Sequence, residues 1–315
     1  MTRPHVPQEV LDLAHARREA RAAKDWTRAD ALRAEIEAAG WKVVDRGIDF
    51  DLEPSHPPDV STGGITRYGS SSSVPSRLGE PTSGLATVVI VDDGWPEDVG
   101  RAVRGIGGDA PEGTEVVIVA DPATDEADLR ALESIEHPSP EVVRTSASLG
   151  SGAALNAGIR RALGLVVVLL DPSVEPTGDI IGPLVRALED PGVGVAGGWG
   201  LRTADLRHFE EAMGADADFR RADYVSRGPL DEKFRFYRNL DIWWSLVLRD
   251  EGEGRTPRRA VVVPGLPATR HEHRAWTGTP AEERDRLSKR NFYRILDRFG
   301  GRLDLAGSVT VPSRH

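Results

Sequence analysis

Residues 148–173, SLGSGAALNAGIRRALGLVVVLLDPS, decide the fold that the sequence predicts. A turn of small residues opens a helix over 150–163, and the apolar run LGLVVVLL follows at 163–170. This run is too short to cross a membrane, and its β-branched residues indicate a buried strand at 165–170. Asp171 stands directly after that strand, so the stretch predicts a helix, a core strand and an acid at the strand end.

Apolar strands and helices alternate on both sides of this stretch. The other predicted strands cover 86–91, 115–120, 141–145 and 193–197. Further helices are predicted near 96–106, 125–135 and 177–189. This alternation is typical of an α/β protein with a mostly parallel, doubly wound sheet flanked by helices. After residue 200 the alternation weakens, and two more helices are predicted at about 241–251 and 280–299.

The composition excludes several classes of protein. The 315 residues carry a formal net charge of -10, which argues against a nucleic-acid binder that works through a broad basic face. The chain has no cysteine, so disulfides, thiolate catalysis and cysteine-ligated zinc are excluded. The first twenty residues lack the apolar core of a secretory signal, and no transmembrane segment is predicted. We therefore expect a cytoplasmic protein.

The chain divides into four predicted regions. They are a helical module at 1–52, a Pro/Gly/Ser-rich linker at 53–84, an α/β domain at 85–300 and a C-terminal tail at 301–315. The module is predicted to form two helices, the second between an Asp25 N-cap and a Gly40 stop. Apolar faces are predicted for the first helix at Val10, Leu13 and Ala14, and for the second at Trp26, Ala29, Leu32, Ile36 and Ala39.

Acids follow three of the predicted strands. Asp92 and Asp93 come after the first strand, Asp121 after the second and Asp171 after the strand at 165–170. Ligands of doubly wound sheets bind at the carboxyl ends of the strands. Each acid alone is more simply explained as a turn residue, but together they favour a site at this edge. Asp171 with a neighbouring oxygen ligand is suited to Mg²⁺ or Mn²⁺ against a diphosphate.

Two other motifs carry less information. The turn before the helix at 150–163 fails the dinucleotide fingerprint because Leu155 occupies the third glycine position, so close helix–sheet packing is its simpler explanation. The motif RHEH at 270–273 follows a predicted strand, RRAVVV. On an extended segment its His271 and His273 would share a face, which favours a metal or phosphate partner.

Four motifs in this order resemble a known family. They are VIVADPATD (117–125), the stretch at 148–173, GADADFRRADYVSRGPLDEKFRFYRNLDIWWSLVLRDEG (214–252) and RHEH (270–273). Over about residues 86–300 the chain resembles a family-two glycosyltransferase of the GT-A fold, of the rhamnosyltransferase-like kind. The resemblance implies transfer of a sugar from a nucleotide-sugar donor to an acceptor hydroxyl, usually with inversion, assisted by Mn²⁺ or Mg²⁺.

The resemblance also implies roles for single residues. Asp121 matches the acid that contacts the nucleotide, Asn156 the Asn of the AxNxG turn, and Asp171 the first acid of the metal-binding DxD motif. Asp241 matches the general base that deprotonates the acceptor, and His271 the late His that helps to hold metal and diphosphate. Burial of Asp241 among aromatic side chains would raise its pKa and make it a better base.

The chain departs from the family pattern at two positions. Ser173 replaces the second DxD acid, which makes it a weaker metal ligand, and Leu240 replaces the Glu that usually precedes the catalytic Asp. Catalytic competence is therefore a separate question from the fold. Candidate acceptor or sugar contacts are Tyr237, Trp243, Trp244, Arg270 and His273.

The N-terminal region resembles a different family. Residues 5–48 are similar to the C-terminal helical segment of cysteinyl-tRNA synthetase, with its DxxxADxLRxxIxxxGxxVxD pattern. The catalytic signature of that enzyme is absent, which excludes aminoacylation. The module is close to neutral, although Arg17, Arg18, Arg21 and Lys24 are candidates for a local basic stripe. Docking or oligomerisation is the favoured role, and nucleic-acid binding is not.

Three hypotheses remain from the sequence. The first is a nucleotide-sugar-dependent glycosyltransferase with an unidentified hydroxyl acceptor. The second is a non-catalytic, GT-A-like protein that binds nucleotide sugars or serves as a scaffold. The third is an RNA-associated protein recruited through the N-terminal module.

Overall fold

The computed structural model describes residues 6–47, 49–136, 138–211 and 218–306. The chain separates into two compact units, Met1–Ser70 and Ser71–His315. The division falls within the predicted linker at 53–84, and each unit is described below by itself. Within the described residues, no helix combines the length and the apolar character that crossing a bilayer requires.

The first unit combines two helices with two antiparallel strand pairs. Helices α1 (Gln8–Ala22) and α2 (Trp26–Ala38) form a hairpin, and β1 (Trp41–Arg46) pairs with β2 (Asp49–Pro54). Short strands β3 (Val60–Thr62) and β4 (Ile65–Arg67) form a second pair. The Asp25 carboxylate accepts a hydrogen bond from the Arg28 amide, which confirms the predicted N-cap.

A small core stabilises this unit. Its buried members are Val10, Ala14, Ile36, Trp41 and Val43. The prediction that Trp26 belongs to the apolar face of α2 was wrong, because Trp26 is the first residue of that helix and is 58% exposed. Arg17 is buried and donates two hydrogen bonds to Asp45, which also pairs with Arg21. Part of the predicted basic stripe is therefore neutralised within the module.

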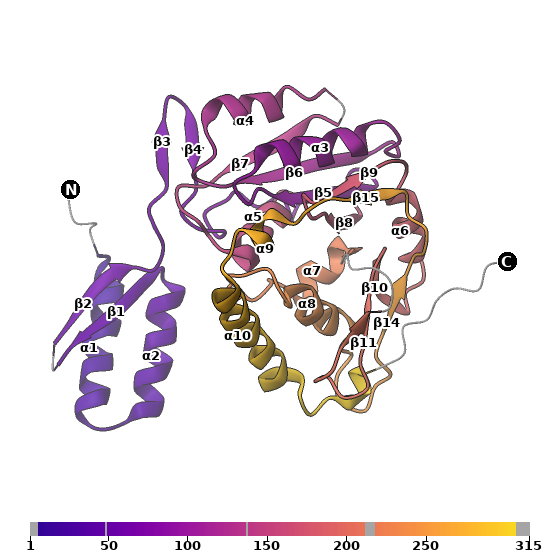
Figure 1. Ribbon diagram of the computed structural model, residues 1–315. Helices are drawn as coiled ribbons and strands as arrows, with labels where there is room; N and C mark the ends of the chain where they lie inside the picture. The colour runs from indigo at the N-terminus through magenta and orange to yellow at the C-terminus, as the bar shows by residue number, and fades with distance from the viewer. Residues whose placement is uncertain (1–5, 48, 137, 212–217, 307–315) are drawn as a thin grey trace. The chain divides into compact units, whose positions relative to one another are not determined.

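A five-stranded sheet forms the centre of the second unit (Figure 1). Its strand order is β13-β8-β5-β6-β7, with β8, β5, β6 and β7 parallel and β13 antiparallel to β8. The strands are β5 (Ala86–Val91), β6 (Thr114–Ala120), β7 (Pro140–Arg144), β8 (Val166–Leu169) and β13 (Phe219–Arg220). The predicted mostly parallel α/β sheet is confirmed, with the boundaries of β5 to β8 within one residue of those predicted.

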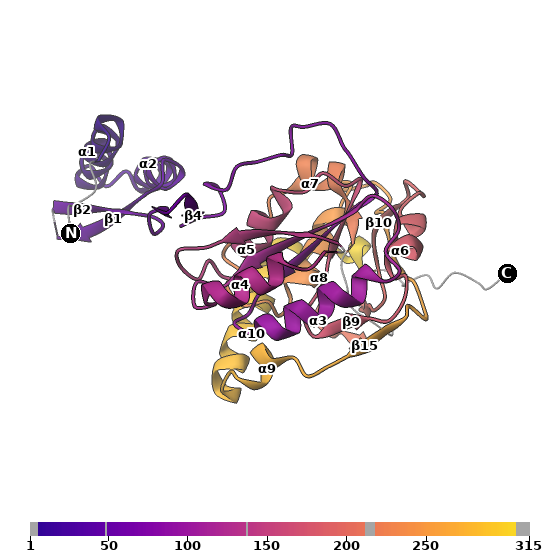
Figure 2. The same ribbon diagram turned by 90° about the horizontal axis from the view of Figure 1, so that it is seen from above.

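Helices cover both faces of the sheet, and alternate residues of β5 belong to different cores. Val88 and Ile90 pack in a core with α3 (Pro96–Gly107), α4 (Glu126–Glu133) and α6 (Ile181–Ala187). Val89 packs in a second core with α5 (Ser151–Ile159), α7 (Arg221–Arg227), α8 (Leu240–Arg249) and α10 (Ala281–Phe299). Figure 2 shows α3 and α4 side by side, and Figure 1 shows them on the opposite side of the sheet from α5 and α8.

Apart from β13, the strands after residue 170 form smaller pairs. β10 (Val193–Gly197) has the predicted bounds; it pairs with β14 (Arg259–Val262) and contacts the edge of the five-stranded sheet through a bridge between Ala196 and Asp218. β9 (Val174–Pro176) pairs with β15 (Ala268–Arg270), and β11 (Leu201–Arg202) pairs with β12 (Glu210–Glu211). The short elements α9 (Arg274–Thr277) and η1 (Leu303–Leu305) complete the described chain.

Helix α5 approaches the sheet closely because its residues are small. A Cβ atom placed on Gly158 would lie 2.4 Å from Val89 Cγ1 and 3.0 Å from Val119 Cγ2. No side chain fits there without displacing the sheet. The simpler interpretation of the small-residue stretch at 148–158, close helix–sheet packing, is confirmed.

Asn156 connects α5 to the turn that leads towards α8. Its Nδ2 donates to the Leu230 carbonyl at 2.9 Å and to Glu232 Oε1 at 3.0 Å. Its Oδ1 accepts from the Tyr224 hydroxyl and from the Leu230 amide, each at 2.9 Å. A side-chain amide has two donors and two acceptor positions, so Asn156 has no hydrogen-bonding capacity left.

Replacing Asn156 by Ala should lower the free energy of unfolding by about 3 kcal/mol, because the Leu230 amide and carbonyl and the Tyr224 hydroxyl lose their buried partner. Tyr224→Phe removes one hydrogen bond and should cost about 1 kcal/mol. Urea denaturation of the whole chain measures both effects. In the Asn156→Ala background, Tyr224→Phe should be close to neutral; additive losses would contradict this description of the contact.

Candidate active site

Three strand ends bring acids together at one edge of the sheet. Asp92 and Asp93 follow β5, Asp121 follows β6, and Asp171 lies two residues after β8. The charges of Asp171, Asp92 and Asp121 all act on Asp93. The sequence prediction that these acids share one edge therefore agrees with the structure.

Asp171 is held by a short network of donors. Ser173 donates to Asp171 Oδ1 from both its amide, at 2.8 Å, and its hydroxyl, at 2.6 Å. Nε2 of His273 lies 2.9 Å from Asp171 Oδ2. Burial alone would raise the pKa of Asp171, but these neighbours outweigh it and hold the pKa below its ordinary value. Ser173 is thus a positioning group for Asp171 in this structure.

The two histidines of RHEH contact different acids. The His271 amide donates to the Ser173 carbonyl at 2.8 Å, and His271 Nε2 lies 2.6 Å from Glu175 Oε2. β15 ends at Arg270, and Nδ1 of His273 then caps α9 by accepting from the Trp276 amide. His273, and not His271, faces Asp171 because the chain leaves the extended conformation between them.

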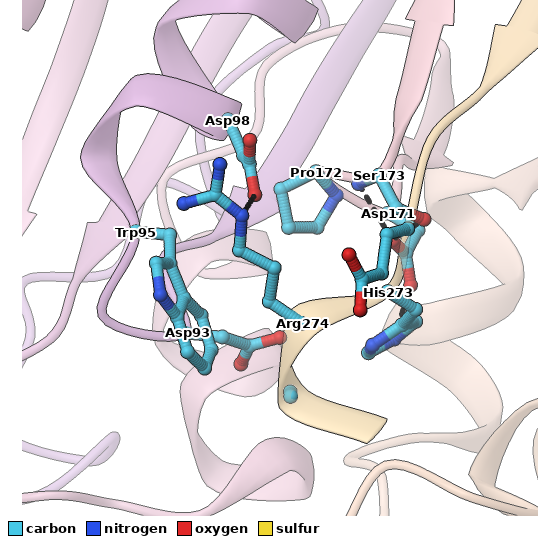
Figure 3. Close-up of a pocket in the computed structure, with 10 residues that line it drawn as sticks. Asp93, Trp95, Asp98, Asp171, Pro172, Ser173, His273 and Arg274 are labelled. Carbon is cyan, nitrogen blue, oxygen red and sulfur yellow. Dashed lines mark hydrogen bonds and ion pairs between the residues drawn. The ribbon is translucent and has the colours of Figure 1, made fainter. Parts of the chain in front are cut away.

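A hollow of about 230 Å³, counted with its part open to solvent, lies at this edge (Figure 3). Its lining residues come from the loop after β5, the start of α3, the loop after β8, and the segment before α9 with the first turn of that helix: Asp93, Trp95, Asp98, Asp171, Pro172, Ser173, Glu272, His273, Arg274 and Ala275. Arg274 Nε lies 3.2 Å from Asp98 Oδ2, which fixes α9 to α3. The hollow therefore has acidic walls and cationic groups on one side.

Asp93 is the most strongly perturbed acid of the hollow. Asp93 is exposed to solvent. The protein around its carboxylate nevertheless desolvates it and, together with the charge of Asp171, raises the pKa of Asp93 to about 7. The sequence shows two adjacent acids, Asp92 and Asp93, but it does not indicate that they differ in environment. The structure distinguishes them, because Asp92 is 3% exposed and accepts hydrogen bonds from Thr124 and the Gly94 amide.

Asp121 and Asn156, both predicted to contact the nucleotide, occupy different environments. Asp121 is half-buried at the end of β6, where its carboxylate accepts from the Ala123 amide at 2.8 Å. It lies among the strand-end acids. Asn156 is 1% exposed and fully hydrogen-bonded within the protein, so it supports the turn at 230–232 and has no free group for a nucleotide.

Asp241 is exposed at the first turn of α8, beside a turn that α10 holds in place. Nδ2 of the buried Asn291 donates to the carbonyls of Phe236 and Arg238, each at 2.8 Å. Asn239 adopts φ 69° and donates from its side chain to the Ser288 carbonyl. The surrounding protein desolvates the Asp241 carboxylate and raises its pKa, as expected for an acid in a concave site.

Tyr237 links Asp241 to the hollow. Its ring stacks on His273 with centroids 4.3 Å apart and 17° between the planes. Desolvation, with the charges of Asp171 and Asp93, raises the pKa of Tyr237, so its hydroxyl stays protonated at neutral pH. Arg238 acts electrostatically on both Tyr237 and Asp241. The loop at 236–241 therefore borders the same site as Asp171.

The remaining candidates lie elsewhere. Trp243 and Trp244 are 4% and 0% exposed and belong to the core of α8, where Trp244 packs edge-on against Phe219. Neither ring forms an open stacking surface. Leu240 is also in this core, at 3% exposure. Arg270 is exposed and stacks on Trp199 at 3.7 Å from the ring centroid, outside the set of residues that lines the hollow.

The donor groups suit a divalent cation only in part. No set of three His, Asp or Glu side chains converges as a metal site within the residues that the structure describes. However, His273 Nε2 is buried and makes no well-angled hydrogen bond, although Asp171 Oδ2 is 2.9 Å away. Neighbouring ligands of an octahedral ion with bonds of about 2.1 Å are similarly spaced. Asp171 and His273 thus fit two of the coordination positions of such an ion, and substrate and water would occupy the others.

Comparisons with known proteins give matches to two parts of the chain. The family model for glycosyl transferase family 2 matches residues 96–246, and that for the cysteinyl-tRNA ligase anticodon binding domain matches residues 3–48. A segment of 50 residues is 54% identical to the cysteine–tRNA ligase of Opitutus terrae, covering 16% of this chain and 11% of that enzyme.

Two solved structures share the fold of the second unit. GalNAc-T7 with UDP, GalNAc and Mn²⁺ has a TM-score of 0.51 at 17% identity, over 68% of this chain and 48% of that one. The mannosyltransferase PcManGT from Pyrobaculum calidifontis, with GDP-Man and Mn²⁺, has a TM-score of 0.50 at 19% identity, over 74% and 71%. Residues 96–246 therefore match the glycosyl transferase family 2 model, the second unit has the GT-A fold, and the segment before it is similar to that of cysteinyl-tRNA ligases.

Proposed function

We propose that the second unit transfers a sugar from a nucleotide-sugar donor to an acceptor hydroxyl, with inversion at the anomeric carbon. The observation that carries the proposal is the ring of Tyr237, which stacks on His273 beside Asp171 and lies four residues before Asp241. Asp171 lies in the hollow at the strand ends, and the Tyr237 loop joins that hollow to the exposed Asp241. The match to glycosyl transferase family 2 supports the same reaction class.

The donor would bind at the strand ends. Asp121 is our candidate for the nucleotide contact, and Asp171 with His273 would hold Mn²⁺ or Mg²⁺ against the diphosphate. This assignment favours His273 over His271, because only His273 approaches Asp171. A bound cation would neutralise the charge that develops on the departing diphosphate. Ser173 orients Asp171 and is not needed as a ligand.

Asp241 would act as the general base. Its carboxylate takes the proton of the acceptor hydroxyl while that oxygen bonds to the anomeric carbon and the bond from this carbon to the diphosphate oxygen breaks. The raised pKa of Asp241 makes it a stronger base than an ordinary aspartate. Leu240 removes the usual acidic neighbour, but Asp241 remains exposed to substrate.

The first unit is proposed as an accessory module for docking or oligomerisation. Arg17 and Arg21 pair with Asp45, which leaves less free positive charge for RNA. We keep the predicted boundaries at 1–52, 53–84, 85–300 and 301–315 as a proposal for the domain organisation.

A non-catalytic nucleotide-sugar-binding or scaffold protein is the second candidate. Ser173 and Leu240 favour it, because each replaces an acid of the family pattern with a side chain that cannot take over its charge. This candidate predicts nucleotide binding without turnover.

Asp241→Asn should reduce kcat/KM for donor hydrolysis or transfer by a factor of about 10²–10⁴ while leaving nucleotide affinity unchanged, because it removes only the base. The assay uses a panel of UDP-, GDP- and dTDP-sugars with Mn²⁺. Asp285→Asn, on the exposed surface of α10, is the matched control and should keep full activity. If wild type and Asp241→Asn bind nucleotide but are equally inert, the non-catalytic candidate replaces the enzyme.

The pH profile should show an acidic limb above the ordinary pKa range of aspartate. The base must be ionised and its pKa is raised, so kcat/KM should fall tenfold per pH unit as the pH drops below that raised pKa. Asp241→Glu should keep a limb of this kind, and the residual activity of Asp241→Asn should lose it. An unchanged limb in Asp241→Asn would assign the titration to another acid, such as Asp93.

A further inference from the structure

A cluster of arginines and aromatic rings surrounds Trp276, which follows His273 by three residues, and includes Arg238, which precedes Asp241 by three. The guanidinium of Arg284 lies 4.5 Å from the centroid of the Trp276 ring, and that of Arg238 lies 5.3 Å from it. Phe236 stacks on the same indole at 6.5 Å. We call Arg238, Trp276 and Arg284, with Phe236 beneath them, the arginine–tryptophan cluster.

The backbone around this cluster is fixed by α10. Asn291 is 2% exposed and donates hydrogen bonds to the carbonyls of both Phe236 and Arg238. The backbone at Arg238 is therefore held without its own side chain. Arg284 belongs to α10 and donates from Nη1 to the Trp276 carbonyl at 3.2 Å. A guanidinium has five N–H donors, so most of those on Arg284 remain available. The cluster is therefore pre-organised.

The positive charge of the cluster is not balanced by a carboxylate. Neither Arg238 nor Arg284 forms an ion pair with an acid of the described chain, whereas Arg274, Arg286 and Arg294 each do. Arg238 is exposed, and its charge acts on both Asp241 and Tyr237, while that of Arg284 also acts on Tyr237. Two guanidinium groups without an ion-pair partner in the described chain thus act on Tyr237, and that of Arg238 acts on the proposed base as well.

We propose that the arginine–tryptophan cluster binds an oxyanion on the acceptor, so that the acceptor is a hydroxy compound with a phosphate or carboxylate group. This inference rests on the proposed transferase function. Stacking on an indole holds a guanidinium in orientation while leaving its N–H edge for charge-assisted hydrogen bonds to such a group. The donor diphosphate is assigned to Asp171 and His273, whereas Arg238 of the cluster acts on Asp241, the proposed base that an acceptor hydroxyl must approach.

Calorimetric titration tests this proposal with defined probes. Glycerol 3-phosphate, D-glycerate and uncharged glycerol are each added to the whole protein saturated with UDP or GDP and Mn²⁺. At least one of the two anions should bind, glycerol should not, and Arg238→Gln/Arg284→Gln should weaken the Kd of the anion at least tenfold. The Kd of the nucleoside diphosphate should change less than twofold. Arg286→Gln, an exposed arginine of the same helix, should change neither.

Two outcomes would overturn the proposal. If the double variant loses nucleoside diphosphate affinity as strongly as anion affinity, the cluster binds the donor phosphates. If neither anion binds wild type, or if the double variant binds the anion as well as wild type does, the cluster is not an oxyanion site. If no nucleotide binds, the transferase function fails, and the same anion titration of the free protein still decides the role of the cluster.

Discussion

The four hydrogen bonds of Asn156 are the interaction on which the site depends. They join α5, which packs against the sheet through Gly158, to the turn at 230–232. The chain then continues to Tyr237 and Asp241, and Asn291 holds it a second time at 236–238. The buried side-chain amides of Asn156 and Asn291 thus hold this loop, which has little regular structure of its own, in place relative to the sheet.

Acidic and basic side chains are unevenly distributed around this loop. Asp93 and Asp171 act on Tyr237 of this loop and repel each other when both are ionised, and Asp241 follows at the start of α8. His273 compensates Asp171, and the raised pKa of Asp93 reduces its charge near neutral pH. Asp241 is influenced by Arg238, which lacks a carboxylate partner within the described chain. The arrangement therefore favours an anionic ligand with a cation near Asp171 and a second anionic group near Arg238.

The sheet could be predicted well from the sequence, because β5, β6 and β8 contain continuous apolar runs that indicate buried strands. The acids after them were also predictable, since parallel strands end at one edge. The role of Asn156 was not, because its partners are 68 to 76 residues away. The family resemblance favours His271, but the chain turns into α9 after β15, and His273 is the histidine that lies beside Asp171. Trp243 and Trp244 were expected at the site, but the helix turns them into the core.

The most direct test of this account is Mn²⁺-dependent nucleotide binding by His273→Ala and His271→Ala. Calorimetry of UDP and GDP with and without Mn²⁺ measures the gain in affinity that the cation provides. If Asp171 and His273 form the diphosphate site, wild type and His271→Ala should bind nucleotide more tightly with Mn²⁺, and His273→Ala should lose most of that gain. Equal dependence on Mn²⁺ in His273→Ala and wild type, or its loss in His271→Ala alone, would contradict the account.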